Sequence, residues 1–380
     1  MKKILNFLSI LILCMTILSC DSFDNPNKDV CNLGASNEVY LCSKSWTSFF
    51  DSPISLTLYV TSEDTYSIND VFDFVESTLE QYHNYFDKYN EYPNLTNVYL
   101  INHRLTSSVE IEEALYDAIA FALLHQEEIK IDDFPLFNIA LGPVLSIWHD
   151  ARENPLCEVS LSSMNTVCPV PNELLTGITF HTDPSKIVLT HDQDFTISFL
   201  EEGMEIDLGG FGKGYVSEII TDYLDELNVK YILNTGNSNV KAGGINPNSE
   251  DGFYTIALKR PKIVITDESV YFAYIKLPNN LSIVTSGNYQ RFFIGLEDGL
   301  VYHHIIDPTT NYPGGEAMSV SILYEDGALA DIYSTAIYLM PLEDGLAFVN
   351  QIEGLEAVWY FDSGDIIYSD HFESYLYIPS

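Results

Sequence analysis

Residues 206–215, with the sequence IDLGGFGKGY, combine glycine and lysine in a way that could bind an anion. Gly209, Gly210 and Gly212 are followed by Lys213, after which apolar residues recur at the spacing of one helix face. The pattern predicts an extended segment, a glycine-rich bend and a helix that begins on the bend. The N–H groups at such a helix start attract phosphate, and lysine adds a point charge. The stretch matches neither a Walker A loop nor a dinucleotide-binding fingerprint, so an ordinary tight turn is an equally good interpretation.

Three further side chains are suited to phosphate chemistry. Arg291 follows a predicted turn at Gly287 and could bind a phosphate through two parallel hydrogen bonds, although a surface arginine is as good an interpretation. His303 and His304 lie beside a short apolar run, and histidine is the side chain best suited to general-base work near neutral pH. Either histidine alone would more often be a hydrogen-bonded structural residue.

An aspartate and a threonine four residues apart form a candidate cation site. Asp331 and Thr335 share one face of a predicted helix. Together with backbone carbonyls and water, a carboxylate and a hydroxyl offer the hard oxygen ligands that Mg²⁺ prefers. Asp331 could instead cap the N-terminus of this helix, and the spacing alone favours the cap.

The chain is strongly acidic, with a net charge of −38 and only 17 lysine and arginine residues among 380. Such a charge argues against binding to nucleic acid and against attraction to anionic lipid head groups. An anionic ligand must therefore be held by a few placed cations, by backbone N–H groups or through a divalent metal ion. The apolar content suffices for a core, and the length suits one large domain or two closely joined ones.

The N-terminus has the pattern of a bacterial lipoprotein signal. Lys2 and Lys3 precede an apolar run over residues 4–17, and a small residue stands before Cys20. The run is short for a membrane span. We expect cleavage before Cys20 and lipid attachment there, which anchors the protein to the cell membrane on its extracytoplasmic side; an ordinary secretory signal or an uncleaved anchor is the alternative. The expected organisation is a signal peptide over 1–19, a lipidated flexible tether over 20–45 and one folded domain over 46–380.

Four cysteines remain beyond Cys20, an even number for an exported protein in an oxidising compartment. They permit three pairings. We favour the two local ones, Cys31 with Cys42 and Cys157 with Cys168, because the loops that they close have matching short lengths. A zinc site is disfavoured because neither pair has the close spacing or the nearby histidine of such a site.

The secondary-structure pattern predicts an α+β fold, because strands and helices occur without regular strand–helix–strand alternation. Residues 150–176 are predicted to form an irregular loop that carries one cysteine pair. The expected helices span 71–86, 111–124, 329–340 and 343–352, and the expected strands lie near 49–60, 187–189, 195–200, 231–234, 254–259, 273–277 and 281–286.

Four stretches that carry these candidate residues follow one another in a characteristic order. In this order they resemble the FAD:protein FMN transferases, the ApbE-type flavin transferases. A lipoprotein signal is also usual in that family. The four stretches are 207–215 (DLGGFGKGY), 285–291 (TSGNYQR), 304–308 (HIIDP) and 330–336 (ADIYSTA).

The resemblance continues upstream of the glycine-rich stretch. Residues 86–89 (FDKY) with Asn102, and residues 137–143 (FNIALGP) before Trp148, match the N-terminal half of the family. The similarity therefore covers about residue 49 to at least residue 352. It implies a mixed-sheet α+β fold with helices packed on the sheets.

The resemblance also implies a reaction. FAD is bound with Mg²⁺, or another divalent cation, on its pyrophosphate. A Thr or Ser hydroxyl of a target flavoprotein attacks the FMN phosphorus, and AMP leaves. The target would be a subunit of a redox-driven ion pump or an extracellular electron-transfer protein, and no nucleic acid takes part.

By position, the resemblance assigns roles to residues of this chain. His304 would be the base for the incoming hydroxyl. The side chains of Asp331 and Thr335 would ligate the metal ion, together with the backbone carbonyls of Gly210 and Ser334. The residues expected to contact FAD are Tyr89, Asn138, Ile139, Ala140, Asp207, Lys213, Arg291 and Ile306.

Some positions depart from the usual family pattern. Residues 234–237 are Asn-Thr-Gly-Asn where the family often has Asn-x-Gly-Gly, and Asn311 ends a turn that usually closes with glycine. Asparagine tolerates positive φ, so that turn can survive. The usual Gly-Thr near Asp51 is absent. Two alternatives stay open: hydrolysis of FAD to FMN and AMP, and a lipoprotein that binds flavin without catalysis.

Overall fold

The computed structural model describes most of the chain beyond the expected signal peptide. Cys20, the expected lipidation site, and Asn237 of the 234–237 turn lie outside the described residues. Within the described part, no helix combines the length and the apolar character needed to cross a bilayer. The described residues are 31–33, 38–131, 134–160, 165–236, 238–261 and 270–378.

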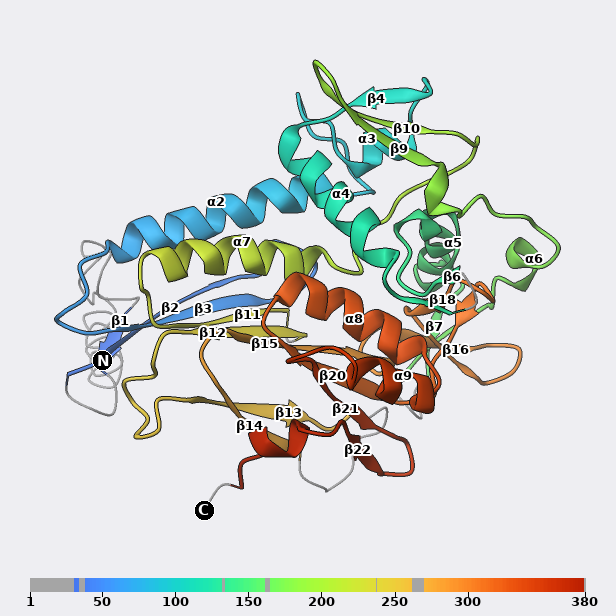
Figure 1. Cartoon of the computed structure of the whole chain (residues 1–380). Helices are drawn as coiled ribbons and strands as arrows, with labels where there is room; N and C mark the ends of the chain where they lie inside the picture. The colour runs from blue at the N-terminus through green and yellow to red at the C-terminus, as the bar shows by residue number, and fades with distance from the viewer. Residues whose placement is uncertain are drawn as a thin grey trace, which may run out of the picture.

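One antiparallel sheet, nine strands wide within the described residues, organises the fold (Figure 1). Its order brings together segments that lie far apart in the chain. The strands in order across the sheet are β1 (Cys31–Leu33), β2 (Tyr40–Trp46), β3 (Ile54–Val60), β11 (Tyr231–Thr235), β12 (Asn239–Gly243), β15 (Leu281–Gly287), β20 (Ser319–Tyr324), β21 (Glu356–Tyr360) and β22 (Ile366–Tyr368).

The two faces of this sheet carry separate hydrophobic clusters, because side chains alternate between the faces along each strand. Helices α2 (Ile68–Phe86), α7 (Gly212–Glu226) and α8 (Gly327–Leu339) cover one face, as Figure 1 shows. The hairpin of β13 (Tyr254–Lys259) and β14 (Tyr271–Leu277) covers the other. The contact of α7 with α8 places the two candidate stretches of these helices side by side.

Smaller elements gather beside one end of the large sheet, at the right of Figure 1. One small sheet has the order β4–β10–β9, and another has the order β17–β16–β8–β7 and packs against α5. The strands are β4 (Ser108–Glu110), β5 (Lys130–Ile131), β6 (Phe134–Pro135), β7 (Glu158–Val159), β8 (Thr166–Cys168), β9 (Ile187–His191), β10 (Phe195–Phe199), β16 (Phe292–Gly295), β17 (Val301–His303), β18 (Ile306–Asp307) and β19 (Tyr312–Pro313). The helices are α3 (Val98–Asn102), α4 (Glu113–Gln126), η1 (Ile139–Leu141), α5 (Gly142–Arg152), α6 (Asn172–Leu175) and η2 (Pro184–Lys186). Elsewhere, α9 (Leu342–Val349) packs against β21, and η3 (Phe372–Tyr375) packs against β14 and β21.

The structure confirms the α+β class and the four predicted helices, with shifted ends. Helix α2 begins at Ile68 because Ser67 caps it by accepting a hydrogen bond from the Asp70 N–H. Two expectations are wrong. Residues 31–33 and 40–45, expected in the flexible tether, lie in sheet strands, and residues 150–176 include the end of α5, two short strands and α6. Among these strands, β8 also pairs with β16 far along the chain, a partner that the local pattern does not show.

Both favoured disulfides are present. Cys31 and Cys42 are directly opposite each other in the pairing of β1 with β2. Cys157 and Cys168 connect the segment after α5 to β8. Each bond joins cysteines 11 residues apart in the sequence, so the two form a matched pair at different places in the fold.

Candidate active site at the start of α7 and α8

The glycine-rich bend and Asp331 meet where α7 approaches α8. The backbone N–H of Gly214 donates a 2.9 Å hydrogen bond to Oδ2 of Asp331. A Cβ at position 214 would lie 2.3 Å from the carbonyl oxygen of Gly327 and 2.7 Å from Cβ of Asp331. Only glycine therefore permits this approach, which sets a buried carboxylate against the first turn of α7.

Asp331 lies inside α8 and does not cap it, so the interpretation favoured by spacing alone is wrong. The cap is Asp326, which accepts hydrogen bonds from the N–H groups of Ala328 and Leu329 at 2.8 and 2.9 Å. With the helix start satisfied five residues earlier, the Asp331 carboxylate remains available to a ligand. Burial raises its pKa, against the opposing effects of Lys213 and the Gly214 N–H.

The donor set around Asp331 fits a hard divalent cation. Thr335 lies one helical turn further along α8 and is partly exposed, and Gly210 lies in the exposed bend before α7. Ser334 is buried, with its hydroxyl 2.8 Å from that of Ser286 on β15. Among the described residues, no group of three or more His, Cys, Asp or Glu side chains forms a metal site. A cation here would thus be held by one carboxylate with hydroxyl, carbonyl and substrate oxygens, as is usual for Mg²⁺.

Asp207, before the bend, is engaged in a buried ion pair. Lys88 Nζ lies 2.7 Å from Oδ2 of Asp207, and the Gly209 N–H donates to Oδ1 at 2.8 Å. Burial alone would raise the pKa of Asp207, but the ion pair with Lys88 and the hydrogen bond lower it. Asp207 therefore fixes the bend to the segment that follows α2, and Lys88 is a residue that the sequence did not single out.

The segment Asn138–Ala140 lies beside this bend. The Asp207 N–H donates to the carbonyl of Ile139 at 2.8 Å. The side chain of Asn138 accepts from the Ala140 N–H and donates to the carbonyl of Thr182, at 2.8 and 2.9 Å. The side chains of Ile139 and Ala140 are fully buried in the core. Their expected contact with FAD is thus limited to backbone, and Asn138 is the polar side chain of the segment.

The last turn of α5 adds two basic residues that the sequence did not indicate. The rings of Tyr89 and His149 lie with their centroids 4.4 Å apart, and Arg152 Nη2 is 3.3 Å from Nδ1 of His149. Lys88 Nζ lies 5.2 Å from the centroid of the Tyr89 ring. Tyr89, half exposed, thus lies between the Lys88 ammonium group and the His149 ring, whose pKa is lowered by burial and by the charges of Arg152 and Lys88.

His304 follows β17 and belongs to the same electrostatic neighbourhood. Its N–H donates to the carbonyl of Arg291 at 3.1 Å, and its buried Nδ1 has no hydrogen-bond partner among the described residues. Burial lowers the pKa of His304 to about 3, and the charges of Arg291, Arg152 and Lys213 contribute. The imidazole is therefore neutral at pH 7 in the free protein.

His303 has a different environment. It is buried, its ring contacts Tyr338 of α8 edge-on at 5.8 Å, and its Nδ1 accepts from the Ile305 N–H at 3.3 Å. Burial lowers its pKa to about 4. Ile306 is buried in the hydrophobic cluster around α5, so its side chain packs beneath the site.

The site concentrates positive charge in a chain that is otherwise acidic. Lys88 and Arg152 act on the pKa of His149, and Arg152, Lys213 and Arg291 act on that of His304. Four lysine and arginine side chains from four separate regions, Lys88, Arg152, Lys213 and Arg291, thus lie in this neighbourhood. Such an arrangement suits a compact polyanion such as a pyrophosphate.

Comparison with known proteins shows the family of this chain. The sequence matches the ApbE family over residues 50–359, and the chain belongs to that family. It is 30% identical over 236 residues to the FAD:protein FMN transferase of Klebsiella pneumoniae (strain 342), a match that covers 61% of this chain and 66% of that protein, slightly under two thirds. The FAD:protein FMN transferase of Treponema pallidum (strain Nichols) is 25% identical, with 67% and 68% covered.

Solved structures show the same fold. The ApbE protein of Thermotoga maritima superposes with a TM-score of 0.70 at 23% identity, covering 90% of this chain and all of that one. The apo form of the Pseudomonas stutzeri flavinyl transferase ApbE gives 0.69 at 18% identity, covering 90% and 99%. At these identities the structures establish the α+β architecture alone.

Proposed function

We propose that this chain transfers FMN from FAD to a Thr or Ser hydroxyl of a target flavoprotein and releases AMP. One observation carries the proposal: the neutral His304 and the buried Asp331 flank a cluster of cations at the start of a helix, in a chain of the ApbE family. Relatives with up to 30% identity are named FAD:protein FMN transferases.

The residues divide the work of phosphoryl transfer. Arg152, Arg291 and Lys213, with the positive dipole end of α7, bind the pyrophosphate and offset charge on the transferring phosphoryl group. His304 accepts the proton of the acceptor hydroxyl as its oxygen bonds to the FMN phosphorus. The bond between that phosphorus and the bridging oxygen breaks, and AMP leaves with the electron pair.

Asp331 and Thr335, with the carbonyls of Gly210 and Ser334, would hold a divalent cation such as Mg²⁺. When bound, the cation supplies Lewis-acid stabilisation of the pyrophosphate oxygens. The low pKa of His304 arises partly from the surrounding arginines and Lys213. A bound pyrophosphate neutralises these charges and so raises the proton affinity of His304 once substrate is present.

The target and the location belong to the same proposal. Lipid attached at Cys20 would hold the enzyme on the extracytoplasmic side of the membrane, where the acceptor would be an ion-pump subunit or an exported electron-transfer protein. Two disulfides support an oxidising compartment. The acidic chain leaves nucleic acid outside the range of partners.

Incubation of the purified domain with FAD and Mg²⁺, with and without a Thr-containing acceptor peptide, tests the proposal. Transfer gives AMP and a flavinylated peptide, and it stops in excess EDTA. AMP with free FMN, whether or not peptide is present, would identify a hydrolase instead. Flavin binding without AMP would identify a binding protein.

A further inference from the structure

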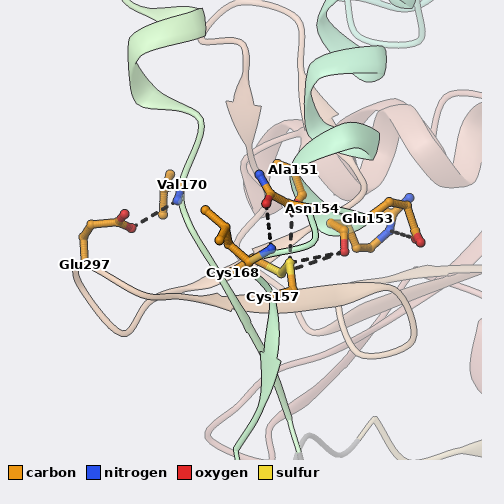
Figure 2. The surroundings of a disulfide bond; sticks show 9 residues. Ala151, Glu153, Asn154, Cys157, Cys168, Val170 and Glu297 are labelled. Carbon is orange, nitrogen blue, oxygen red and sulfur yellow. Dashed lines mark hydrogen bonds and ion pairs between the residues drawn. A yellow bond between two sulfur atoms is a disulfide. The ribbon is translucent and has the colours of Figure 1, made fainter.

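The disulfide Cys157–Cys168 lies against the end of α5 that carries Arg152 (Figure 2). Cys157 Sγ is 3.4 Å from the carbonyl oxygen of Ala151 and 3.5 Å from that of Arg152. A disulfide sulfur has no hydrogen to donate, so these are packing contacts with the last turn of the helix. The connection is short, because the Cys157 N–H donates to the carbonyl of Asn154 at 2.9 Å.

The other half of the disulfide leads to Arg291. Strand β8, which contains Cys168, pairs in parallel with β16, and the Leu296 N–H donates to the Cys168 carbonyl at 2.9 Å. Arg291 immediately precedes β16, and its carbonyl accepts from the His304 N–H. One covalent bond and one small sheet therefore connect the backbone of Arg152 with that of Arg291 and His304.

The connection through the disulfide and the small sheet holds two positively charged side chains, Arg152 and Arg291, near each other. Burial lowers the pKa of Arg152, and the nearby charge of Arg291 lowers it further. Arg291 is exposed, whereas Arg152 is partly buried, with the Glu153 carboxylate 3.9 Å from its Nε. The repulsion and the cost of burial therefore favour movement of Arg152 into water unless the backbone fixes it. Helix α5 has 11 residues, and the last turn of a short helix opens readily without a constraint.

We propose that the Cys157–Cys168 disulfide positions Arg152 beside Arg291 for binding a pyrophosphate. This role rests on the proposed function, in which the two arginines bind the pyrophosphate of FAD. Without the bond, the last turn of α5 moves outward and Arg152 turns into solvent, so the anion must reorder it on binding. The chain then binds its substrate most tightly where the disulfide is formed, outside the reducing cytoplasm.

The chain offers a matched control in its other disulfide, which joins cysteines the same 11 residues apart at the far edge of the large sheet. Cys157→Ser/Cys168→Ser and Cys31→Ser/Cys42→Ser are compared by thermal melting and by calorimetric titration with metal-free pyrophosphate. Both variants should melt earlier. The first should weaken pyrophosphate binding about tenfold, or about 1.4 kcal/mol, and the second by less than about twofold. Equal weakening in both, or none in either, overturns the proposal.

A coupling test separates positioning from general stability. In an Arg152→Ala background, removal of Cys157 and Cys168 should change pyrophosphate affinity no further, because the disulfide acts through that arginine. Additive losses overturn the proposal. If wild-type protein binds pyrophosphate but neither binds FAD nor releases AMP, the proposed function fails while the disulfide comparison still stands.

A second variant covers the case in which the serine variant does not fold. Asn154→Gly leaves the disulfide intact and loosens the joint between Arg152 and Cys157. It should weaken pyrophosphate binding in the same direction by a smaller factor, about threefold. Unchanged affinity in a folded Asn154→Gly protein, with the serine variant unfolded, counts against the positioning role.

Discussion

The buried ion pair of Lys88 and Asp207 allows a quantitative prediction for Lys88→Met. The two charged groups are 2.7 Å apart, and their side chains are only 8% and 15% exposed. Methionine keeps the length of the side chain but leaves the Asp207 carboxylate buried with the Gly209 N–H as its remaining contact. Loss of one partner of a buried pair costs about 3–5 kcal/mol, which for a large domain lowers Tm by roughly 6–10 °C.

The pH dependence of this loss has a definite sign. In the wild type the pKa of Asp207 is lowered, so the pair contributes stability above about pH 4, and the contribution is lost as pH falls through the folded-state pKa. In Lys88→Met, burial is no longer opposed by Lys88, so the folded-state pKa of Asp207 rises. Stability of the variant then falls as pH increases through that raised value. The difference in Tm between wild type and variant should therefore shrink from pH 7 towards pH 4.

Calorimetric melts from pH 4 to 8 measure both effects. Lys186→Met is the control, because Lys186 and Asp183 form an exposed pair, 3.7 Å apart with side chains 38% and 52% exposed, whose loss should cost less than about 1 kcal/mol. Lys88→Met/Asp207→Asn should recover part of the stability, since no buried charge is left unpaired. The reasoning fails if Lys88→Met costs no more than Lys186→Met, or if its deficit is the same at every pH.

Four other predictions concern the site and the anchor. Asp331→Asn should lower metal affinity and turnover without loss of fold. Because burial raises the pKa of Asp331, the metal-free variant should be at least as stable as metal-free wild type at pH 7. Metal dependence identical to that of wild type would contradict the assignment of Asp331 as a metal ligand. His304→Ala should reduce the rate of FMN transfer at saturating substrates by about 10²–10⁴-fold, with FAD binding retained. His303→Ala should chiefly reduce Tm, because His303 is buried. If His303→Ala loses more activity than His304→Ala, His303 is the base. The acid limb of kcat/KM for FAD should lie well below pH 6.5, because His304 in the free enzyme has a pKa of about 3; a limb at 6.5 that disappears in His304→Ala would refute this. Cys20→Ser should abolish lipid labelling and membrane fractionation, and unchanged fractionation would exclude the lipoprotein signal.

The local elements could be predicted because their signals are local. Alternating apolar residues mark strands such as β13 and β15 to within a residue or two, and amphipathic spacing marks α2 and α8. The sheet order could not be predicted, because β3 pairs with β11, which lies far away in the sequence. The error over β1 and β2 has another cause. These segments are polar and contain cysteine, and they become strands because β2 pairs with β3 and β1 pairs with β2.

The candidate site residues that lie in a sequence motif could be predicted, whereas those that only the fold brings to the site could not. The order of the glycine-rich bend, Arg291, His304 and Asp331 is visible in the sequence. No local feature marks Arg152, and Lys88 lies in the 86–89 stretch without a role assigned to it. Both become functional candidates only when α5 and the end of α2 reach the bend. Spacing alone favoured Asp331 as the helix cap, although Asp326 stands five residues earlier, before the same helical pattern. The hydrogen bonds distinguish the two: Asp326 accepts from the Ala328 N–H at the start of α8, and Asp331 accepts from the Gly214 N–H.

The Cys31–Cys42 bond has a mechanical consequence for a chain anchored at Cys20. If Cys20 carries the proposed lipid, a pull from the membrane would reach the described part of the fold at β1, which meets β2 in three residue pairs within the described residues. Without the disulfide, the hydrogen bonds between β1 and β2 would break one after another under such a load. The covalent bond passes the load directly to β2, whose seven pairs with β3 resist together, in shear. A chain anchored as proposed would therefore keep its sheet closed under such a load.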